Sequence, residues 1–231
     1  MVTNGLTDFH THTLHSDGEL LPAELVARAA VNGYAVVGLA DHADASNFAE
    51  VIAAARETAA AWNGIRGGIR VIPGVELTYV PPAQLADMAA VCRAAGAVLI
   101  VVHGESPVEP VPAGTNDAAL AADIDILAHP GLITPAQAQR AAQRGIALEL
   151  TTRGGHSLTN GHVAKLARAA GAPLVLDTDA HRIDDLLTAA LAEQTLRGAG
   201  LTPAQAAAVL RHNARLAAQL LRRWAQSERD A

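Results

Sequence analysis

The sequence predicts an α/β barrel of parallel strands, and three observations carry this prediction. Strand-like runs alternate with helix-like segments seven times, at the spacing of βα units. Nearly every strand run ends in a histidine or a carboxylate. Half of the residues are hydrophobic and only 3% are aromatic, so the core has to be aliphatic. An open doubly wound sheet would gather its ligand at one switch point, whereas a barrel brings all its strand ends to one mouth. The even distribution of polar strand ends therefore favours a barrel, with seven strands.

The expected strands are short aliphatic runs. The first lies around Leu6 and Phe9, and the others are expected over residues 36–40, 70–75, 97–102, 125–128, 146–150 and 174–176. Pro73 and Gly74 make the third of them irregular, because proline cannot donate to a sheet ladder. Each run is too short and too aliphatic to be a surface helix, so we interpret all seven as buried strands.

The expected helices have a 3.6-residue apolar period and clear end signals. They cover residues 22–32, 46–63, 84–95, 134–144, 160–170 and 184–197, with a shorter helix over 117–122. Thr134 begins a Thr-Pro-Ala-Gln capping box, and the same four residues recur at Thr202. The second copy opens C-terminal helices, over about 203–226, that should pack on the barrel. We expect residues 1–231 to form one domain, with the loop over residues 104–116 lying above a site.

Composition excludes several classes of function. The net charge is −6 and there is no long basic run, which argues against nucleic-acid binding. The single cysteine, Cys92, excludes an intramolecular disulfide and a thiolate metal cluster. No basic leader and no apolar run of about 18 residues is seen, so we expect neither a signal peptide nor a membrane span. The expectation is a cytoplasmic enzyme without a membrane partner. Its oligomeric state is not indicated by the sequence.

The strand ends offer the ligands of a metal centre. His10 and His12 are two residues apart, so in an extended chain both side chains point to the same face. The later strand runs lead into His42, Glu76, His103, His129, Asp179 and His181. One such histidine alone is more often an ordinary polar residue, but six of the ten histidines fall at strand ends. Imidazole with carboxylate and no thiolate suits Zn, Mn or Fe. There are enough ligands for two or three divalent ions, with Glu76 as a natural bridge.

The complete set of motifs resembles the PHP (polymerase and histidinol phosphatase) family. The matching residues are His10-x-His12 with Ser16-Asp17-Gly18, Asp41-His42, Gly74-Val75-Glu76 and Asp179-x-His181, with His103 and His129-Pro130 between them. The resemblance extends to about Asp185. It implies a distorted (β/α)7 barrel with a trinuclear metal centre and phosphoesterase chemistry.

The resemblance also implies which residue holds which ion. The first ion would be held by His10, His12, Glu76 and Asp179, the second by Glu76, His103 and His129, and the third by Asp17, His42 and His181. A hydroxide between the first two ions, held by Glu76 and Asp179, would attack phosphorus. For the substrate phosphate we expect Arg153 from the loop after the sixth strand, with His156 in the same loop and Arg182 as further candidates. Glu149, inside the sixth strand, is expected to be a buried structural carboxylate.

These expectations predict a metal-dependent phosphomonoesterase acting on a small-molecule phosphate ester, with histidinol phosphate as the family-level example. Two other functions stay open. A phosphodiesterase or 3′–5′ exonuclease of the same family is disfavoured by the acidic charge balance. A non-catalytic metal-binding module is disfavoured by the complete ligand set.

Overall fold

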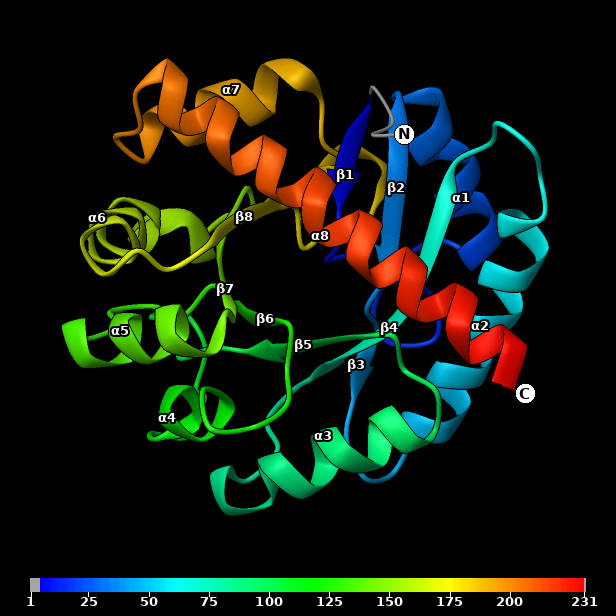
Figure 1. Ribbon diagram of the computed structural model, residues 1–231, viewed down its shortest axis with the longest axis horizontal. Coiled ribbons are helices and arrows are strands. Elements are labelled where there is room, and N and C mark those ends of the chain that lie inside the picture. Colours follow the sequence, from blue (N-terminus) through cyan, green and yellow to red (C-terminus); the bar gives the residue numbers. More distant parts are fainter. Residues whose placement is uncertain (1–4, 231) are drawn as a thin grey trace.

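The computed structural model describes residues 5–230, which form a nearly closed barrel of parallel strands surrounded by helices (Figure 1). Its strands are β1 (Leu6–Asp8), β2 (Tyr34–Leu39), β3 (His42–Ala43), β4 (Arg70–Leu77), β5 (Leu99–His103), β6 (Ile126–Ala128), β7 (Ala147–Thr151) and β8 (Leu174–Asp177). The order around the barrel is β1-β2-β4-β5-β6-β7-β8, and every pair is parallel. β3 also pairs with β4 and continues β2 after a short interruption. The described strands therefore occupy seven positions around the barrel, which confirms the predicted fold.

The barrel closes between its first and last strands through few backbone contacts. Thr11 and Ala180 form an isolated parallel bridge, and the His12 N–H donates to the Ala180 carbonyl at 2.8 Å. Nearer the start of the two strands, side-chain carboxylates take the place of the backbone hydrogen bonds between β1 and β8. Asp177 Oδ1 accepts from the Phe9 N–H at 2.7 Å, and Asp8 Oδ1 accepts from the Thr178 N–H at 3.1 Å. We call these two aspartates, with the backbone groups they bind, the seam.

The helices that follow the strands pack their aliphatic faces on the barrel (Figure 1). They are α1 (Pro22–Val31), α2 (Phe48–Asn63), α3 (Leu85–Ala94), α4 (Thr115–Ala119), α5 (Pro135–Arg144), α6 (Asn160–Ala170) and α7 (Ala189–Gly198). Three short 3₁₀ turns lie at Pro82–Gln84, His156–Thr159 and Ile183–Asp185. The capping box predicted at Thr134 is confirmed, because its side chain accepts from the Gln137 N–H while Gln137 accepts from the Thr134 N–H.

The C-terminal segment is a single helix, α8 (Pro203–Asp230), longer than the expected 203–226. It crosses one end of the barrel (Figure 1). The Asn213 amide donates to the Leu176 carbonyl at 2.7 Å, and Arg223 donates to the Val98 carbonyl just before β5 at 2.6 Å. The helix therefore covers the end where the strands begin and leaves their carboxyl ends free for a site. None of the helices described has the length and apolarity needed to cross a membrane.

Two expected helix boundaries are wrong. The helix predicted over 184–197 begins only at Ala189, where the Thr188 side chain caps it by accepting from the Leu191 N–H. The preceding segment is held by tertiary contacts, since the Leu187 N–H donates to the Tyr34 hydroxyl at 2.6 Å. The helix predicted over 117–122 is α4, which begins at Thr115. The Glu105 carboxylate accepts from the N–H groups of Gly114 and Asn116, and this starts the helix earlier.

Candidate metal centre

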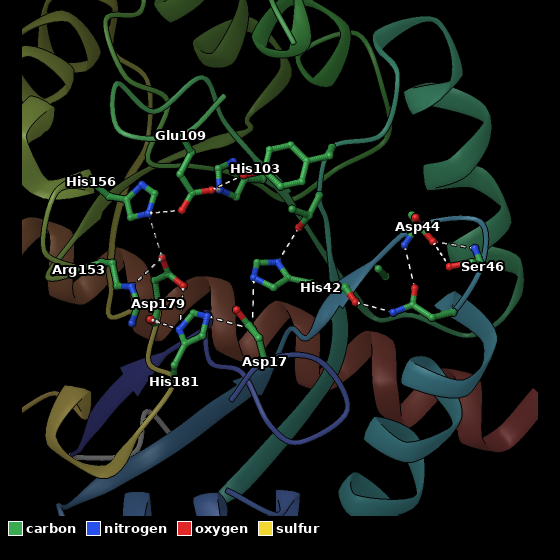
Figure 2. Close-up of a pocket in the computed structure, with 14 residues that line it drawn as sticks. Asp17, His42, Asp44, Ser46, His103, Glu109, Arg153, His156, Asp179 and His181 are labelled. Carbon is green, nitrogen blue, oxygen red and sulfur yellow. Dashed lines mark hydrogen bonds and ion pairs between the residues drawn. The ribbon is translucent and has the colours of Figure 1, made fainter. Parts of the chain in front are cut away.

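The strand ends bring the predicted ligands together at one mouth of the barrel. His10 Nε2 lies 3.2 Å from Glu76 Oε1, and His12 Nε2 lies 3.1 Å from Asp179 Oδ1. At the outer side, Asp17 Oδ1 lies 3.1 Å from His181 Nε2 and 3.4 Å from His42 Nε2 (Figure 2). Tetrahedral ligands on bonds of about 2.0–2.1 Å lie roughly 3.3 Å from one another. These separations are therefore those of side chains that share an ion.

The candidate ligand atoms fall into groups that overlap the expected sites. One group holds His10, His12 and Asp179, a second holds His103, His129 and His156, and a third holds His12, Asp17, His42 and His181. Glu76 lies between them. Its Oε1 is 3.2 Å from His10 Nε2 and 3.6 Å from His129 Nε2, and its Oε2 is 2.6 Å from His42 Nδ1. This central position is the one that the sequence predicts for a bridging carboxylate.

Unpaired buried atoms show that divalent ions fit this centre. Across residues 5–230, seven buried side-chain nitrogen or oxygen atoms have no hydrogen-bond partner. Six of them belong to His10, His12, Glu76 and His129, and the seventh is Asp177 Oδ2. A buried polar atom without a partner costs about 1–3 kcal/mol, so such atoms are rarely concentrated in one place. Their convergence, with imidazole and carboxylate as the donors, suits Zn, Mn or Fe.

Glu149 holds the His10 side chain and the His129 backbone in position. It is fully buried, as expected, and its Oε1 lies 2.7 Å from His10 Nδ1. Its Oε2 accepts from the His129 N–H at 2.8 Å, so both of its oxygens are used. A carboxylate on Nδ1 fixes the tautomer that leaves Nε2 free for a metal. Glu149 is therefore a positioning residue behind His10 and is not itself free to bind an ion.

Asp41, Gly18 and Thr78 help to position the third ligand group. Asp41 Oδ1 accepts from the Thr13 N–H and from Ser16 Oγ, both at 2.6 Å, which shapes the loop that carries Asp17. Gly18 completes this loop, because a Cβ there would collide with the His12 carbonyl. On the other side, Thr78 Oγ1 lies 2.6 Å from His42 Nδ1.

Mutual attraction sets the protonation of the centre. Burial opposes charge on His10, but Glu76, Glu149 and Asp179 outweigh it and raise its pKa well above the usual value. Burial likewise opposes charge on His42, while Glu76 and Asp17 raise its pKa to about 10. Burial would raise the pKa of Glu76, yet His10 and His42 hold it well below its usual range. The carboxylates are therefore ionised at neutral pH, as metal ligands have to be.

A cavity of about 470 Å³ opens above the ligands (Figure 2). It is lined by Asp17, His42, Ala43, Asp44, Ser46, Asn47, Thr78, Tyr79, His103, Glu109, Arg153, His156, Asp179 and His181. Arg153 is the one arginine or lysine in that lining. Its Nη1 lies 3.3 Å from Asp185 Oδ2, and its Nε lies 3.9 Å from Asp179 Oδ2. The guanidinium thus lies beside the ligand groups, where the sequence predicts it.

The other two substrate candidates lie differently. His156 lies in the second ligand group, beside His103 and His129. Its Nδ1 is 2.6 Å from Ser106 Oγ. Arg182 does not line the cavity. Its side chain is 60% exposed, and its Nε lies 3.7 Å from Asp185 Oδ1.

Among the cavity residues that sequence reasoning missed, Glu109 and Tyr79 contact His103. Glu109 Oε2 lies 3.0 Å from His103 Nε2, and the Tyr79 hydroxyl donates to the same oxygen at 2.7 Å. The hydrogen bond from His103 lowers the pKa of Glu109 to about 2. A carboxylate within the loop expected to lie above the site was the signal that could have found it.

The sequence matches the model of a known family. The model of the PHP domain matches residues 8–152, so the chain belongs to the PHP family, and it is a metal-dependent hydrolase. It is 46% identical over 200 residues to an uncharacterized protein of Methanocaldococcus jannaschii, a match that covers 84% of this chain and 90% of that protein. It is also 39% identical over 71 residues to a 5'-3' exoribonuclease of Haemophilus influenzae, covering 31% of this chain and 23% of that enzyme.

Solved structures share the barrel at low sequence identity. A chain in the structure of archaeal ribonuclease P with mature tRNA superposes with a TM-score of 0.64 and 19% identity, covering 94% of this chain and 93% of that one. A putative prolidase from Bifidobacterium longum gives a TM-score of 0.62 and 18% identity, covering 93% of this chain and 69% of that one. At these identities the likeness concerns the fold alone.

Proposed function

We propose that this protein is a phosphomonoesterase acting on a small phosphorylated metabolite, for which histidinol phosphate is the model substrate. The observation that supports this most directly is the cavity of about 470 Å³, which is lined by members of the candidate ligand groups and by one arginine. That volume suits a small metabolite. The combination of divalent ions with one guanidinium suits a terminal phosphate.

The proposed ligand sets are those given by the family resemblance. His10, His12, Glu76 and Asp179 hold the first ion, Glu76, His103 and His129 the second, and Asp17, His42 and His181 the third. When bound, the ions lower the pKa of a water nucleophile and neutralise charge on the phosphoryl group. Glu76 and Asp179 keep the sites anionic, and Glu149 keeps Nε2 of His10 free.

Arg153 is proposed to bind the substrate phosphate. Its planar guanidinium can donate two parallel hydrogen bonds to phosphate oxygens. Asp185 holds the side chain from one side at 3.3 Å, and the Arg153 N–H donates to Thr151 Oγ1 at 3.1 Å. These contacts already restrict the conformations of the Arg153 side chain. It therefore loses less conformational entropy when it binds phosphate, which favours affinity.

The likeness to a 5'-3' exoribonuclease supports a nuclease as the second candidate. The lining of the cavity weighs against it. Asp17, Asp44, Glu109 and Asp179 face the cavity with one arginine, and a polynucleotide needs several cations along its backbone. A small ester presents only one phosphate and needs only the centre and Arg153.

The deciding experiment is an activity comparison on protein loaded with Zn or Mn. We expect phosphate release from histidinol phosphate or p-nitrophenyl phosphate, and loss of that release in His10→Ala. Arg153→Ala should raise KM more than it lowers kcat, whereas Arg182→Ala, which removes the same charge outside the cavity, should change neither. Failure of a metal-replete sample to hydrolyse any phosphomonoester would reject the proposal. Shortening of single-stranded RNA or DNA at ordinary salt would instead favour the nuclease, and no hydrolysis of either would favour a non-catalytic module.

A further inference from the structure

Glu109 contacts the second ligand group from outside the barrel strands. It lies on the loop over residues 104–114, between β5 and α4, and its side chain reaches into the cavity between two histidines (Figure 2). Its Oε2 lies 3.0 Å from His103 Nε2 and its Oε1 lies 3.2 Å from His156 Nε2. These separations lie in the same range as those between the barrel ligands, a spacing that fits an ion pair in the absence of metal and two ligands of one ion in its presence.

The surrounding residues hold Glu109 in this place. The Tyr79 hydroxyl donates to Glu109 Oε2 at 2.7 Å, and its ring stacks on His103 with 5.6 Å between centroids. Tyr79 has a φ of 54°, a left-handed conformation that costs a non-glycine residue free energy and that persists only where other contacts require it. The strained backbone of Tyr79 is therefore part of the support for Glu109.

The loop itself has fixed ends and an exposed tip. Glu105 Oε1 accepts from the N–H groups of Gly114 and Asn116, both at 2.9 Å, which ties the two ends together. Ser106 Oγ lies 2.6 Å from His156 Nδ1, so the same loop turns Nε2 of His156 towards Glu109. Pro107, Val108 and Pro110 are exposed around Glu109, whose side chain is 35% exposed. One loop thus supplies a carboxylate and aims a histidine at the same point.

We propose that Glu109 is a displaceable ligand of the second ion, which it binds together with Glu76, His103, His129 and His156, and that the substrate phosphate takes its place. The inference rests on the proposed metal centre. A metal site closed by protein ligands is structural, while a catalytic site needs an open position. Glu109 is the most exposed member of this set, with a side chain that is 35% exposed while the others are buried, so it is the ligand that can leave. In the exchange one bond from the ion to a carboxylate oxygen breaks and one bond to a phosphoryl oxygen forms.

This exchange makes Glu109 a selector of substrates. An anion has to compete with a tethered carboxylate before it reaches the ion. A phosphate dianion, which Arg153 also attracts, can do so, while a monoanionic carboxylate cannot. Removing the Glu109 charge should therefore weaken metal binding and strengthen phosphate binding at the same time. A residue with only a structural role would not produce opposite effects.

The test compares Glu109→Gln with the wild type in two titrations. Co²⁺ affinity is measured against a competing chelator, with the visible absorption of the bound ion as a second readout. Inorganic phosphate affinity is then measured by calorimetry on fully loaded protein. We expect the Co²⁺ ion at the second site to bind about tenfold more weakly than in the wild type, an effect of the size seen when a residue that supports a metal ligand is lost. The affinities of the other sites should be unchanged. Phosphate should bind severalfold more tightly, and the change in Co²⁺ absorption on adding phosphate should shrink.

Asp44→Asn is the matched control. Asp44 lines the same cavity and loses the same charge, but its carboxylate accepts from Ser46 and contacts no candidate ligand. It should shift neither titration more than about twofold. Tyr79→Phe should give a smaller form of the Glu109→Gln effect.

Three results can be told apart. Unchanged Co²⁺ affinity in Glu109→Gln would overturn its role as a ligand. Weaker Co²⁺ binding with unchanged phosphate binding would overturn displacement. Wild-type protein that binds no divalent ion would reject the proposed function itself.

Discussion

Asp177 and Asp179 lie two residues apart at the end of β8, both are buried, and their pKa values shift in opposite directions. Asp177 faces the seam. Burial raises its pKa well above the usual value, and the neighbouring Asp8 and Glu149 carboxylates raise it further. Asp179 faces the metal centre. Burial would raise its pKa too, but His10 and His12 hold it well below the usual range. Depth of burial therefore does not decide the charge of these side chains, whereas the neighbouring charges do.

The same contrast holds between Asp8 on β1 and Glu76 on β4. Burial raises the pKa of Asp8 to about 6, although Thr178, His10 N–H and Tyr34 donate hydrogen bonds to it. Glu76 is just as buried and has a depressed pKa because histidines surround it. The seam thus carries carboxyls that tend to keep a proton and bind backbone groups, and the centre carries carboxylates that are ready for metal. Four substitutions can break or sharpen this contrast.

The largest effect is expected for Asp179→Asn. Asp179 has a φ of 56°, a left-handed conformation that asparagine also tolerates, so the substitution removes charge with little backbone strain. We expect a lower metal content and a loss of several kcal/mol of transition-state stabilisation, roughly a thousandfold in phosphatase activity. Metal analysis together with kcat measures it. Full metal content and activity in this variant would show that the Asp179 charge does not hold an ion.

Glu149→Gln should have an intermediate effect. The His129 N–H needs an oxygen from residue 149, so the glutamine amide has to point its NH₂ at His10 Nδ1. His10 Nδ1 then has to accept a hydrogen bond, so the imidazole proton lies on Nε2. Nε2 can therefore no longer bind a metal ion. We expect a loss of about 10–100-fold in metal affinity or activity. Chelator competition checks it, and thermal unfolding of metal-free protein should show whether the fold is intact. Wild-type affinity would mean that the His10 tautomer is set by other contacts.

Tyr34→Phe tests the seam side. The Tyr34 hydroxyl donates to Asp8 Oδ2 at 3.1 Å and accepts from the buried Leu187 N–H at 2.6 Å. Leaving that N–H unpaired should lower the free energy of unfolding by about 1–2 kcal/mol. Urea unfolding measures this loss. Metal affinity is the control and should be unchanged, so a large loss of metal would contradict the separation of the two regions.

The smallest effect at low pH is expected for Asp177→Asn. Because the folded-state pKa of Asp177 is raised, its proton stabilises the fold fully below about pH 4, and this contribution is lost as the pH rises through the folded-state pKa. Asparagine keeps the oxygen that accepts from the Phe9 N–H and cannot ionise. Near pH 4 the free energies of unfolding of the wild type and Asp177→Asn should differ by no more than about 0.5 kcal/mol, as for a conservative substitution. The variant should then become the more stable of the two as the pH rises.

Urea unfolding of metal-free protein from pH 4 to pH 9 measures this difference. A difference that stays constant with pH would show that Asp177 is ionised in the fold despite its surroundings.

Much of the fold could be predicted because the local signals were unambiguous. Aliphatic runs with helical segments between them indicate parallel strands, and Thr134 carries a complete capping box. The period of a strand places His10 and His12 on one face whatever the remainder of the chain does. The start of α7 could not be predicted in this way. It depends on the hydrogen bond between Leu187 and Tyr34, residues far apart in the chain.

The residues of the candidate site also fall into those that the sequence could predict and those that it could not. Residues at strand ends could be predicted because barrel closure sends all strand ends to one mouth. His181 and Arg182 are adjacent in the chain, yet one lies among the ligands and the other lies outside the cavity. Glu109 is on a loop whose path has no periodicity, so the sequence could indicate a carboxylate above the site but not its contact with His103.

The sequence by itself determined the alternation of elements and which side chains stand at the strand ends, since both follow from hydrophobic periodicity and backbone geometry. Only the tertiary structure decided which carboxylates carry charge and which loop residue reaches the candidate ligands. Those properties depend on neighbours brought together through space, and for a buried group the energy of these neighbours outweighs any preference that the residue has on its own.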